Sequence, residues 1–369
     1  MSAPRHVMVG GFLGAGKTTA IGRLARHLTD RGLRVGLVTN DQSSGLVDSR
    51  VLRGQGWDVE EIAGGCFCCR FTSLEEAMAR LTAATRPDVF LAEPVGSCTD
   101  LVATVSYPLR RIYGAEVRVA PLTVLVDPLR AERVLGWTAE GRSFSPKVRY
   151  VYEKQLEEAR IVLVNKVDLI DDGRRERLVA RLGERFPRAD VLCVGARDGV
   201  GMEAWYERLL AGDSDLGPTL DIDYDLYAAG EAELGWLNAT AQVRSGAPFD
   251  ANTFLGDVAS SVAATLGEQD VEIAHLKLTL DSGSTTGALA AISVVGSERD
   301  VDVRESLLDR VDTGELVINL RAEGAPDALR SAVRRALETH AGDLRVSVEH
   351  WEDFRPAAPV PVHREEVAG

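Results

Sequence analysis

A glycine-rich segment near the start of the chain carries the strongest chemical signal. Residues 11–18 read Gly-Phe-Leu-Gly-Ala-Gly-Lys-Thr and match the pattern G-x-x-x-x-G-K-[ST]. Glycines let backbone N–H groups curl around a phosphate, and a helix that begins at Lys17 adds the positive end of its dipole. We expect Lys17 to reach the β- and γ-phosphates and the Thr18 hydroxyl to bind Mg²⁺. The other residues expected to line the phosphates are Gly11, Gly14, Ala15, Gly16 and Thr19.

A second segment, residues 165–168 (Asn-Lys-Val-Asp), indicates which base the nucleotide carries. Asp168 can accept hydrogen bonds from N1–H and from the exocyclic amine of guanine, and adenine offers no such pair of donors. We expect Asn165 to brace the neighbouring loops and the Lys166 stem to cover the base plane. Ala196 lies in a further loop, residues 195–197, that is placed to contact the base. The segment therefore predicts a guanine nucleotide.

The residues that follow the apolar run 88–92 offer a carboxylate close to the phosphates. Glu93 begins the sequence Glu-Pro-Val-Gly. A carboxylate at the end of a parallel strand can hold Mg²⁺ through water. The backbone N–H of Gly96 can then contact a γ-phosphate. A plain turn from strand to loop remains the alternative.

Three of the five cysteines, Cys66, Cys68 and Cys69, fall within four residues. Cysteines this close in sequence cannot form a useful disulfide framework, so they indicate soft metal ligands or redox thiols. Three thiolates on a loop that begins Gly-Gly suit Zn²⁺, Cu(I) or another soft or borderline metal. Three sulfurs leave one tetrahedral position open, so a bound ion could be passed on. The alternative is a set of small buried side chains.

Alternating strand and helix patterns provide the elements that must hold these residues. An apolar strand at 5–10, a helical pattern at 17–29 and a strand at 34–39 form a βαβ unit. Runs at 124–127 and 161–165 are continuously apolar, as in parallel strands that helices cover on both faces. Further strands are expected at 59–62, 88–92, 119–126, 160–165 and 190–194. Further helices are expected at 73–84, 128–135, 150–158, 174–186 and 201–210. The fold class predicted is a doubly wound α/β P-loop domain over residues 1–210.

The second half of the chain has a different pattern. Residues 211–234 are acidic, contain Gly and Pro, and are expected to form a linker. Residues 235–355 should form a smaller α+β domain with an antiparallel sheet and helices on one face. Strands are expected there at 239–243, 272–280, 287–295, 315–322 and 344–351, and helices at 251–266 and 327–340. Residues 356–369 are Pro-rich and should be extended or mobile.

Composition excludes several classes of partner. The chain has 369 residues, with 42 Lys+Arg against 56 Asp+Glu, and a formal net charge of −14. A chain this acidic is a poor ligand for nucleic acid or for anionic membrane surfaces. There is no apolar stretch of membrane-spanning length and no signal-peptide pattern at the start. We therefore expect a cytoplasmic protein with no nucleic-acid or membrane partner.

The four motifs, taken in order, resemble the CobW-like branch of metal-handling GTPases, relatives of UreG and HypB. These are GGFLGAGKTT at 10–19, GGCFCC at 64–69, EPVG at 93–96 and NKVD at 165–168. The resemblance covers about residues 5–210, and residues 235–352 are similar to the family's C-terminal domain in element order. It implies that GTP is hydrolysed to GDP and phosphate. It also implies that a transition metal, Zn²⁺ first and Co²⁺, Fe²⁺ or Ni²⁺ next, binds the CxCC loop and is delivered to a client enzyme.

The chain departs from the family pattern at two places, after the second strand and after Glu93. The family usually has Asn-Glu-Phe-Gly-Glu after the second strand, and residues 39–44 here read Thr-Asn-Asp-Gln-Ser-Ser. Asp41 keeps a carboxylate that could bind Mg²⁺, bind the transition metal or position the attacking water. Ser44 replaces a glutamate that can serve as a ligand. Cys98 follows the Glu93–Gly96 turn, and we expect it to be a local packing residue, with an additional thiol near the site as the alternative.

These features suggest a nucleotide-driven switch. The γ-phosphate would order residues 40–48 and 93–100, and the cysteine loop follows the strand between them, so nucleotide state could change its shape. Lys17, Asp41 and Glu93 are the candidate catalytic residues, and slow intrinsic turnover is expected because no arginine finger is identifiable. The alternative is a nucleotide-gated assembly factor for a cofactor-dependent enzyme, such as a corrinoid enzyme, without metal carriage. A small-molecule kinase is disfavoured by residues 165–168, and a homodimer is left open.

Overall fold

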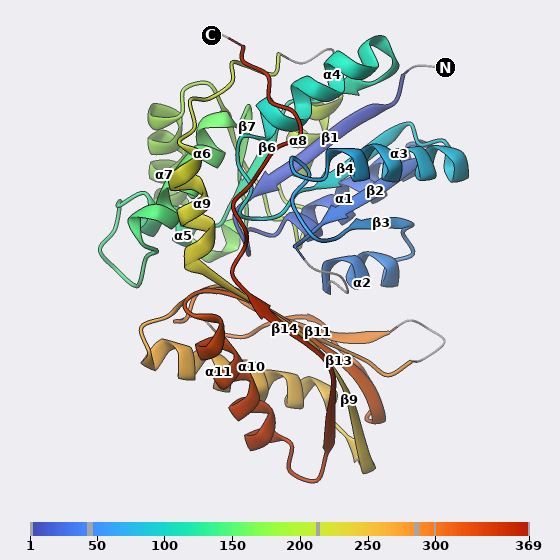
Figure 1. The fold of residues 1–369 in the computed structure, drawn as a ribbon, viewed down its shortest axis with the longest axis vertical. Coiled ribbons are helices and arrows are strands. Elements are labelled where there is room, and N and C mark those ends of the chain that lie inside the picture. Colours follow the sequence, from blue (N-terminus) through green and yellow to red (C-terminus); the bar gives the residue numbers. More distant parts are fainter. Residues whose placement is uncertain (1–2, 43–46, 212–214, 284–287, 299, 368–369) are drawn as a thin grey trace.

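A computed structural model describes residues 3–42, 47–211, 215–283, 288–298 and 300–367. It contains two β-sheets, one parallel and one antiparallel, which Figure 1 shows above and below each other. We call the elements from β1 to α9 the parallel domain and the elements from β9 to β14 the antiparallel domain. The fold is a doubly wound P-loop domain followed by an α+β domain, as the sequence predicted.

The parallel sheet has the strand order β3-β2-β4-β1-β6-β7-β8, with β5 paired to β1. Its strands are β1 (Arg5–Gly11), β2 (Val35–Asn40), β3 (Val59–Ile62), β4 (Val89–Glu93), β5 (Arg118–Val119), β6 (Thr123–Val126), β7 (Ile161–Val164) and β8 (Asp190–Cys193). Strands β1, β4, β6 and β7 are buried along their whole length, because helices cover both faces of the sheet. All the expected motif loops leave the carboxyl ends of these strands, where ligands bind in folds of this type.

Helices on the two faces complete the parallel domain. They are α1 (Lys17–Asp30), α2 (Val47–Gly54), α3 (Phe71–Thr85), α4 (Tyr107–Tyr113), α5 (Pro128–Val134), α6 (Pro146–Glu158), α7 (Asp172–Arg185), α8 (Met202–Leu210) and α9 (Tyr224–Glu233). Short turns at η1 (Val102–Ser106), η2 (Gly114–Glu116) and η3 (Val167–Leu169) add to them. One apolar cluster, which includes Met8, Phe12 and Phe67, fills one face of the sheet, and another, which includes Ile21 and Trp205, fills the other.

The structure differs from the sequence expectations in one strand and in three helical elements of this domain. The strand expected at 119–126 is two short strands, because Pro121 lies between β5 and β6 and cannot donate a ladder hydrogen bond. The helices α2, η1–α4 and α9 were not expected. Helix α9 lies within the stretch read as a linker and packs on α6, where Tyr227 is buried.

The antiparallel sheet has the order β12-β11-β10-β13-β9-β14. Its strands are β9 (Leu234–Phe249), β10 (Glu272–Asp281), β11 (Leu289–Val294), β12 (Asp302–Glu305), β13 (Val311–Glu323) and β14 (Arg345–Phe354). Helices α10 (Ala251–Glu268) and α11 (Pro326–His340) pack on one face of this sheet. The opposite face carries polar residues that contact the parallel domain, which is why those residues are buried.

The chain then returns to the parallel domain. Residues 355–367 leave β14 in extended form and run along the upper domain to the C-terminus (Figure 1). The backbone N–H of Glu365 donates to the carbonyl of Ala103, and the N–H of Thr219 donates to the carbonyl of Val367. We call residues 355–367 the tail. Within the described ranges, we find no helix with the length and apolar character that crossing a membrane requires.

Candidate nucleotide and metal sites

The loop between β1 and α1 has the shape of a phosphate cradle. Gly14 and Gly16 have φ angles of 77° and 96°, in the left-handed region that favours glycine. A Cβ atom at Gly16 would lie 2.4 Å from Nδ2 of Asn165, so a larger residue could not fit without displacing that side chain. The ammonium of Lys17 donates to the carbonyl of Gly11 over 2.9 Å and closes the loop.

The phosphate loop forms one wall of a cavity of about 690 Å³, which is within the usual size of small-ligand sites. Helix α1, the ends of β2 and β4 and the start of α2 supply further walls on the parallel domain. The remaining wall belongs to the antiparallel domain, and its residues include Trp236, His275, Lys277, Ser293 and Arg304. Both domains therefore build this cavity.

The predicted base-binding residues hold the loops together next to the cavity. The side-chain amide of Asn165 donates to the carbonyl of Ala15 over 2.8 Å and accepts from the N–H of Ala196 over 2.9 Å. Lys166 donates to the carbonyl of Gly14 and to the carboxylate of Asp127. Asp168 is exposed at the start of the same turn. Lys166 and Asp168 do not line the cavity itself, which Arg197 and Gly199 border on this side.

Oxygen ligands gather at the other end of the phosphate loop. The hydroxyl of Thr18 donates to Asp48 over 2.7 Å and lies 3.1 Å from Oε1 of Glu93. The second oxygen of Glu93 is buried and has no hydrogen-bond partner among the described residues. Burial, followed by the charge of Asp48, raises the pKa of Glu93 to about 7. The Thr18 hydroxyl and the carboxylates of Asp48 and Glu93, one oxygen of which has no partner, fit the preference of Mg²⁺ for oxygen ligands.

Asp48, rather than Asp41, contacts Thr18. Asp41 lines the cavity, but its carboxylate pairs with Arg321 of β13 at 3.1 Å. Burial opposes a charge on Asp48, yet Lys277, Thr18 and Lys17 together hold its pKa below the ordinary value. The sequence reasoning missed Asp48, since its only local signal is an acidic residue in the first turn of the short helix α2. Ser44, the other position of interest here, lies outside the described residues.

The three predicted thiol ligands lie together. The sulfurs of Cys66 and Cys68 are 2.7 Å apart, those of Cys66 and Cys69 are 3.1 Å apart, and those of Cys68 and Cys69 are 3.7 Å apart. In a tetrahedral site, Zn–S bonds of about 2.3 Å separate the sulfurs by about 3.8 Å. The three sulfurs would therefore have to spread slightly around an ion. Gly64 and Gly65, with φ angles of 80° and 145°, give the loop that freedom.

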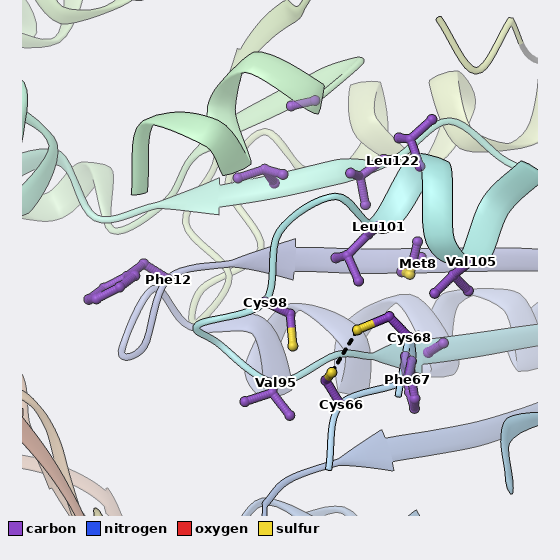
Figure 2. Packing of buried hydrophobic residues seen from close by; sticks show 14 of the residues in the cluster. Met8, Phe12, Cys66, Phe67, Cys68, Val95, Cys98, Leu101, Val105 and Leu122 are labelled. Carbon is purple, nitrogen blue, oxygen red and sulfur yellow. Dashed lines mark hydrogen bonds between the residues drawn. The ribbon is translucent and has the colours of Figure 1, made fainter. Parts of the chain in front are cut away.

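The thiols lie in apolar surroundings instead of at the cavity wall. Cys66 and Cys68 are 3% and 2% exposed, and they pack in the cluster that holds Phe67, Val95 and Leu101 (Figure 2). Hydrogen bonds from the neighbouring thiols lower the pKa of Cys66 well below its usual value, whereas the contact with Cys66, followed by burial, raises the pKa of Cys69 to about 11.

The tail covers the thiols on their outer side. The N–H of Val360 donates to the sulfur of Cys69 over 3.2 Å, and the N–H of Val362 donates to the carbonyl of Cys68 over 2.9 Å. The His363 ring meets the Phe71 ring edge-on. Access to the sulfurs therefore requires movement of the tail or of the cysteine loop.

Cys98 lies beside the thiol cluster. Its side chain is directed toward the pair formed by Cys66 and Cys68 (Figure 2), and it shares a hydrogen bond with Cys66. It is buried, as a packing residue would be, and burial raises the pKa of its thiol well above the ordinary value. It lies outside the compact group of three sulfurs that could hold an ion.

Two segments that line the cavity lie beside the thiol loop, and one of them holds it by hydrogen bonds. At the end of β2, the amide of Asn40 donates to the carbonyls of Ile62 and Gly65, which flank the loop's first turn. After β4, Gly96 packs against Leu13 so closely that a Cβ atom would lie 3.0 Å from its backbone nitrogen. The amide of Gln155 then donates to the carbonyls of Gly96 and Cys98. Asn40 therefore joins the cavity to the cysteine loop, and the turn after Glu93 reaches the sulfurs where Cys98 contacts Cys66.

Comparison with known proteins agrees with this geometry. The family model described as the CobW/HypB/UreG nucleotide-binding domain matches residues 5–192, half of the chain. A zinc chaperone CobW from a Sinorhizobium species is 30% identical over 213 residues, which cover 52% of this chain and 58% of the relative. A zinc chaperone YeiR from Escherichia coli is 33% identical over 93 residues, or 25% of this chain and 28% of the relative. The chain thus spans little more than half the length of the CobW relative.

Solved structures with a related fold include two metal-bound proteins. The Zn(II)-bound YjiA GTPase from Escherichia coli is 15% identical, with a TM-score of 0.37, over 91% of this chain and 99% of that chain. HypB from Helicobacter pylori in complex with nickel is 20% identical, with a TM-score of 0.41, over 56% of this chain and 86% of that chain.

Proposed function

The chain belongs to the CobW/HypB/UreG family, and from this premise we propose that it is a GTP-hydrolysing metallochaperone. It binds a transition-metal ion as cargo through Cys66, Cys68 and Cys69 and delivers that ion to a client metalloenzyme. The observation that carries this proposal is the position of the thiol loop beside the cavity wall. Asn40 lines the cavity and holds the loop at Ile62 and Gly65, and the turn after Glu93 borders the cavity and places Cys98 against Cys66.

The residues around the phosphate loop have separate tasks in hydrolysis. Thr18, Asp48 and Glu93 would hold Mg²⁺, which neutralises charge on the β- and γ-phosphates. Lys17 binds the same oxygens. Water forms a bond to the γ-phosphorus, the bond to the bridging oxygen breaks, and GDP, inorganic phosphate and a proton are released. Asp168 accepts two hydrogen bonds from guanine, and Asn165 keeps that turn against the phosphate loop.

Loss of the γ-phosphate then changes the two segments that lie between the cavity and the thiols. The Gly96 N–H loses its contact with the phosphate, and the end of β2, where Asn40 and Asp41 line the cavity, is free to move. Because Asn40 holds the cysteine loop and Cys98 contacts Cys66, these movements change the spacing of the sulfurs and hence the affinity for the ion. Zn²⁺ is the proposed cargo, since three cysteine thiolates suit it and the CobW and YeiR relatives are named zinc chaperones.

A metal titration in defined nucleotide states tests this proposal. Zn²⁺ affinity is measured by competition with a chromogenic chelator in GDP and in a non-hydrolysable GTP analogue, with Co²⁺, Fe²⁺ and Ni²⁺ in parallel. We expect one high-affinity ion per chain, with an affinity that differs by about 10-fold or more between the two nucleotides. The variants Cys66→Ala, Cys68→Ala and Cys69→Ala should lose that ion, and Cys193→Ala, a thiol on β8, should keep it.

The same titration decides between metal carriage and a nucleotide-gated assembly factor without a metal. The burial of Cys66 and Cys68 among apolar side chains favours that second candidate, because buried thiols also serve as simple packing residues. Metal affinity that the cysteine substitutions leave unchanged would remove the metal site. Affinity that is the same in both nucleotides would remove the coupling and leave a nucleotide hydrolase.

A further inference from the structure

Lys277 brings a positive charge from the antiparallel domain into the nucleotide cavity. It lies on β10, where residues alternate between the two faces of the sheet. Leu276, Leu278 and Leu280 belong to the apolar core that α10 and α11 complete. Lys277 therefore points to the opposite face, toward the parallel domain, and it lines the cavity.

The ammonium of Lys277 lies at the Mg²⁺ end of the phosphate loop. Its Nζ atom is 2.6 Å from both carboxylate oxygens of Asp48, the residue that accepts from the Thr18 hydroxyl. It is also close enough to Lys17 to contribute to the lowered pKa of that side chain, after the larger effect of burial. Two ammonium groups, one from each domain, thus approach the same space.

A phosphate explains why two lysines meet in a largely buried site. Like charges at short range destabilise a fold unless opposite charge lies between them. Asp48 and Glu93 supply that charge in the absence of nucleotide. A bound triphosphate supplies more negative charge than either carboxylate. With Mg²⁺ on Asp48, the ammonium of Lys277 becomes free to pair with phosphate oxygen.

We propose that Lys277 contacts the terminal phosphate of the bound nucleotide, so that the antiparallel domain senses whether that phosphate is present. This inference rests on the proposed binding of GTP. The sequence offered no arginine finger, and a lysine from the second domain supplies a comparable positive charge within the same chain. The contact links the γ-phosphate to β10, and from β10 to the whole antiparallel sheet.

A structural ion pair between the domains is the competing explanation for Lys277. Other contacts of that kind exist, since Arg50 of α2 pairs with Glu315 of β13, and the N–H of Val47 donates to the side chain of Asn319. Arg50 does not line the cavity. The variant Arg50→Gln therefore removes an ion pair between the same two domains without removing a charge from the cavity. It serves as the matched control.

The test compares affinities for GTP analogue and GDP in the full-length protein, measured by fluorescent-nucleotide displacement. We expect Lys277→Gln to weaken binding of the GTP analogue by about 10- to 100-fold, the usual range for a charge-assisted hydrogen bond. Binding of GDP should weaken by less than about 3-fold, because GDP lacks the contacted group. Lys277→Arg should recover most of the affinity for the GTP analogue. Arg50→Gln should weaken the binding of both nucleotides slightly and to the same extent.

A measurement without Mg²⁺ separates the phosphate contact from folding effects. With excess chelator, Asp48→Asn should strengthen binding of the GTP analogue, since it frees Lys277 and removes a negative charge, whereas Lys277→Gln should still weaken it. A structural ion pair would give the two variants the same sign. Equal losses for GTP and GDP in Lys277→Gln would overturn the inference but leave the proposed function intact. A wild-type protein that binds neither nucleotide would overturn the proposed function itself.

Discussion

The cavity and the thiol cluster lie near the same edge of one sheet, yet they are built in opposite ways. The cavity is lined by charged side chains from both domains and has a volume of about 690 Å³. The thiols are packed among apolar side chains, and the tail covers them. A nucleotide therefore meets a site that is already formed, whereas a metal ion meets one that must open.

This difference assigns separate roles to the two regions. A preformed cavity can bind its ligand with only local side-chain changes, such as release of Lys277 from Asp48, so nucleotide is suited to be the input. A closed site changes its affinity when its cover or its loop moves, so the bound metal is suited to be the output. The turn from Gly96 to Asp100 lies between the two regions, and the tail contacts it as well, because Arg364 pairs with Asp100 at 2.8 Å.

The largest expected effect is a loss of nucleotide affinity that leaves the metal affinity of the thiol cluster unchanged. Lys17→Ala removes the ammonium that contacts the phosphates, and we expect affinity for GTP and GDP to fall by about 100-fold or more. Affinity for Zn²⁺ in the absence of nucleotide should stay within about 2-fold, because Lys17 does not contact the thiols. Isothermal titration calorimetry with each ligand measures both quantities.

Lys147→Ala is the control for this substitution, since Lys147 forms an exposed ion pair with Glu233 outside the cavity. A parallel loss of metal affinity in nucleotide-free Lys17→Ala, with an unchanged unfolding temperature, would contradict the separation of the two regions.

A smaller effect is expected at the base. Asp168→Asn replaces one acceptor by a donor, so one of the two hydrogen bonds from guanine is lost and two N–H groups face each other. We expect GTP affinity to fall by about 10- to 50-fold while the much weaker affinity for ATP changes little. Competition between the two nucleotides measures the ratio.

Asp172→Asn is the matched control, because Asp172 is an exposed acidic residue in the first turn of α7 and pairs with Arg175 of the same helix. An unchanged ratio of GTP to ATP affinity in Asp168→Asn would show that the exposed carboxylate does not discriminate between guanine and adenine.

The sequence predicted the parts of both sites that depend on local chain geometry. Glycines with positive φ at positions 14 and 16, an amide at Asn165 and three thiols within four residues all act within one turn, so spacing alone identifies them. Strands β1, β4 and β7 were likewise predicted, because these buried strands are largely apolar. The boundaries of α10, β10 and α11 were also predicted to within two residues.

Contacts between distant segments were not predicted. Arg321 and Lys277 lie on strands in which apolar and polar residues alternate, as they do in many strands. That alternation does not show that the polar face contacts the parallel domain. Asp41 was expected to bind Mg²⁺ or the transition metal, or to position water, and no local pattern indicated that Arg321 would pair with it or that Asp48 would contact Thr18. The tail was expected to be extended or mobile, and no local pattern indicates that its backbone would contact the thiols.

The cover over the thiols gives the third prediction. Deletion of residues 356–369 removes the hydrogen bonds from Val360 and Val362 to the cysteine loop, so we expect metal association to become faster by about 10-fold. Nucleotide affinity should change by less than about 2-fold, because the tail does not line the cavity. Stopped-flow mixing with a zinc-loaded indicator measures the association rate.

A chain that lacks only residues 368 and 369 is the control for this deletion. An unchanged association rate in the longer deletion, with the fold retained by circular dichroism, would mean that the ion enters by movement of the cysteine loop alone.

The smallest expected effect concerns the turn between the two regions. The hydroxyl of Ser97 donates to Glu231 of α9 over 2.6 Å, and burial, followed by the charge of Cys66, raises the pKa of Glu231 to about 8. The folded protein thus binds a proton that the unfolded chain releases near pH 4.5. The contribution of Glu231 to stability is complete below that pH and is lost as the pH rises through about 8.

Glu231→Gln keeps an acceptor for Ser97 and removes the charge, so its stability should not fall over this range. One pKa unit corresponds to about 1.4 kcal/mol, and hydration of the site reduces that cost, so we expect the variant to gain about 1–2 kcal/mol over wild type between pH 5.5 and pH 8.5. Denaturant unfolding of the metal-free, reduced protein measures this difference. A gain that does not depend on pH would show that Glu231 is already charged in the fold. The turn between the cavity and the thiols would then carry a buried charge in place of a neutral hydrogen bond, and it would itself respond to a charge on Cys66.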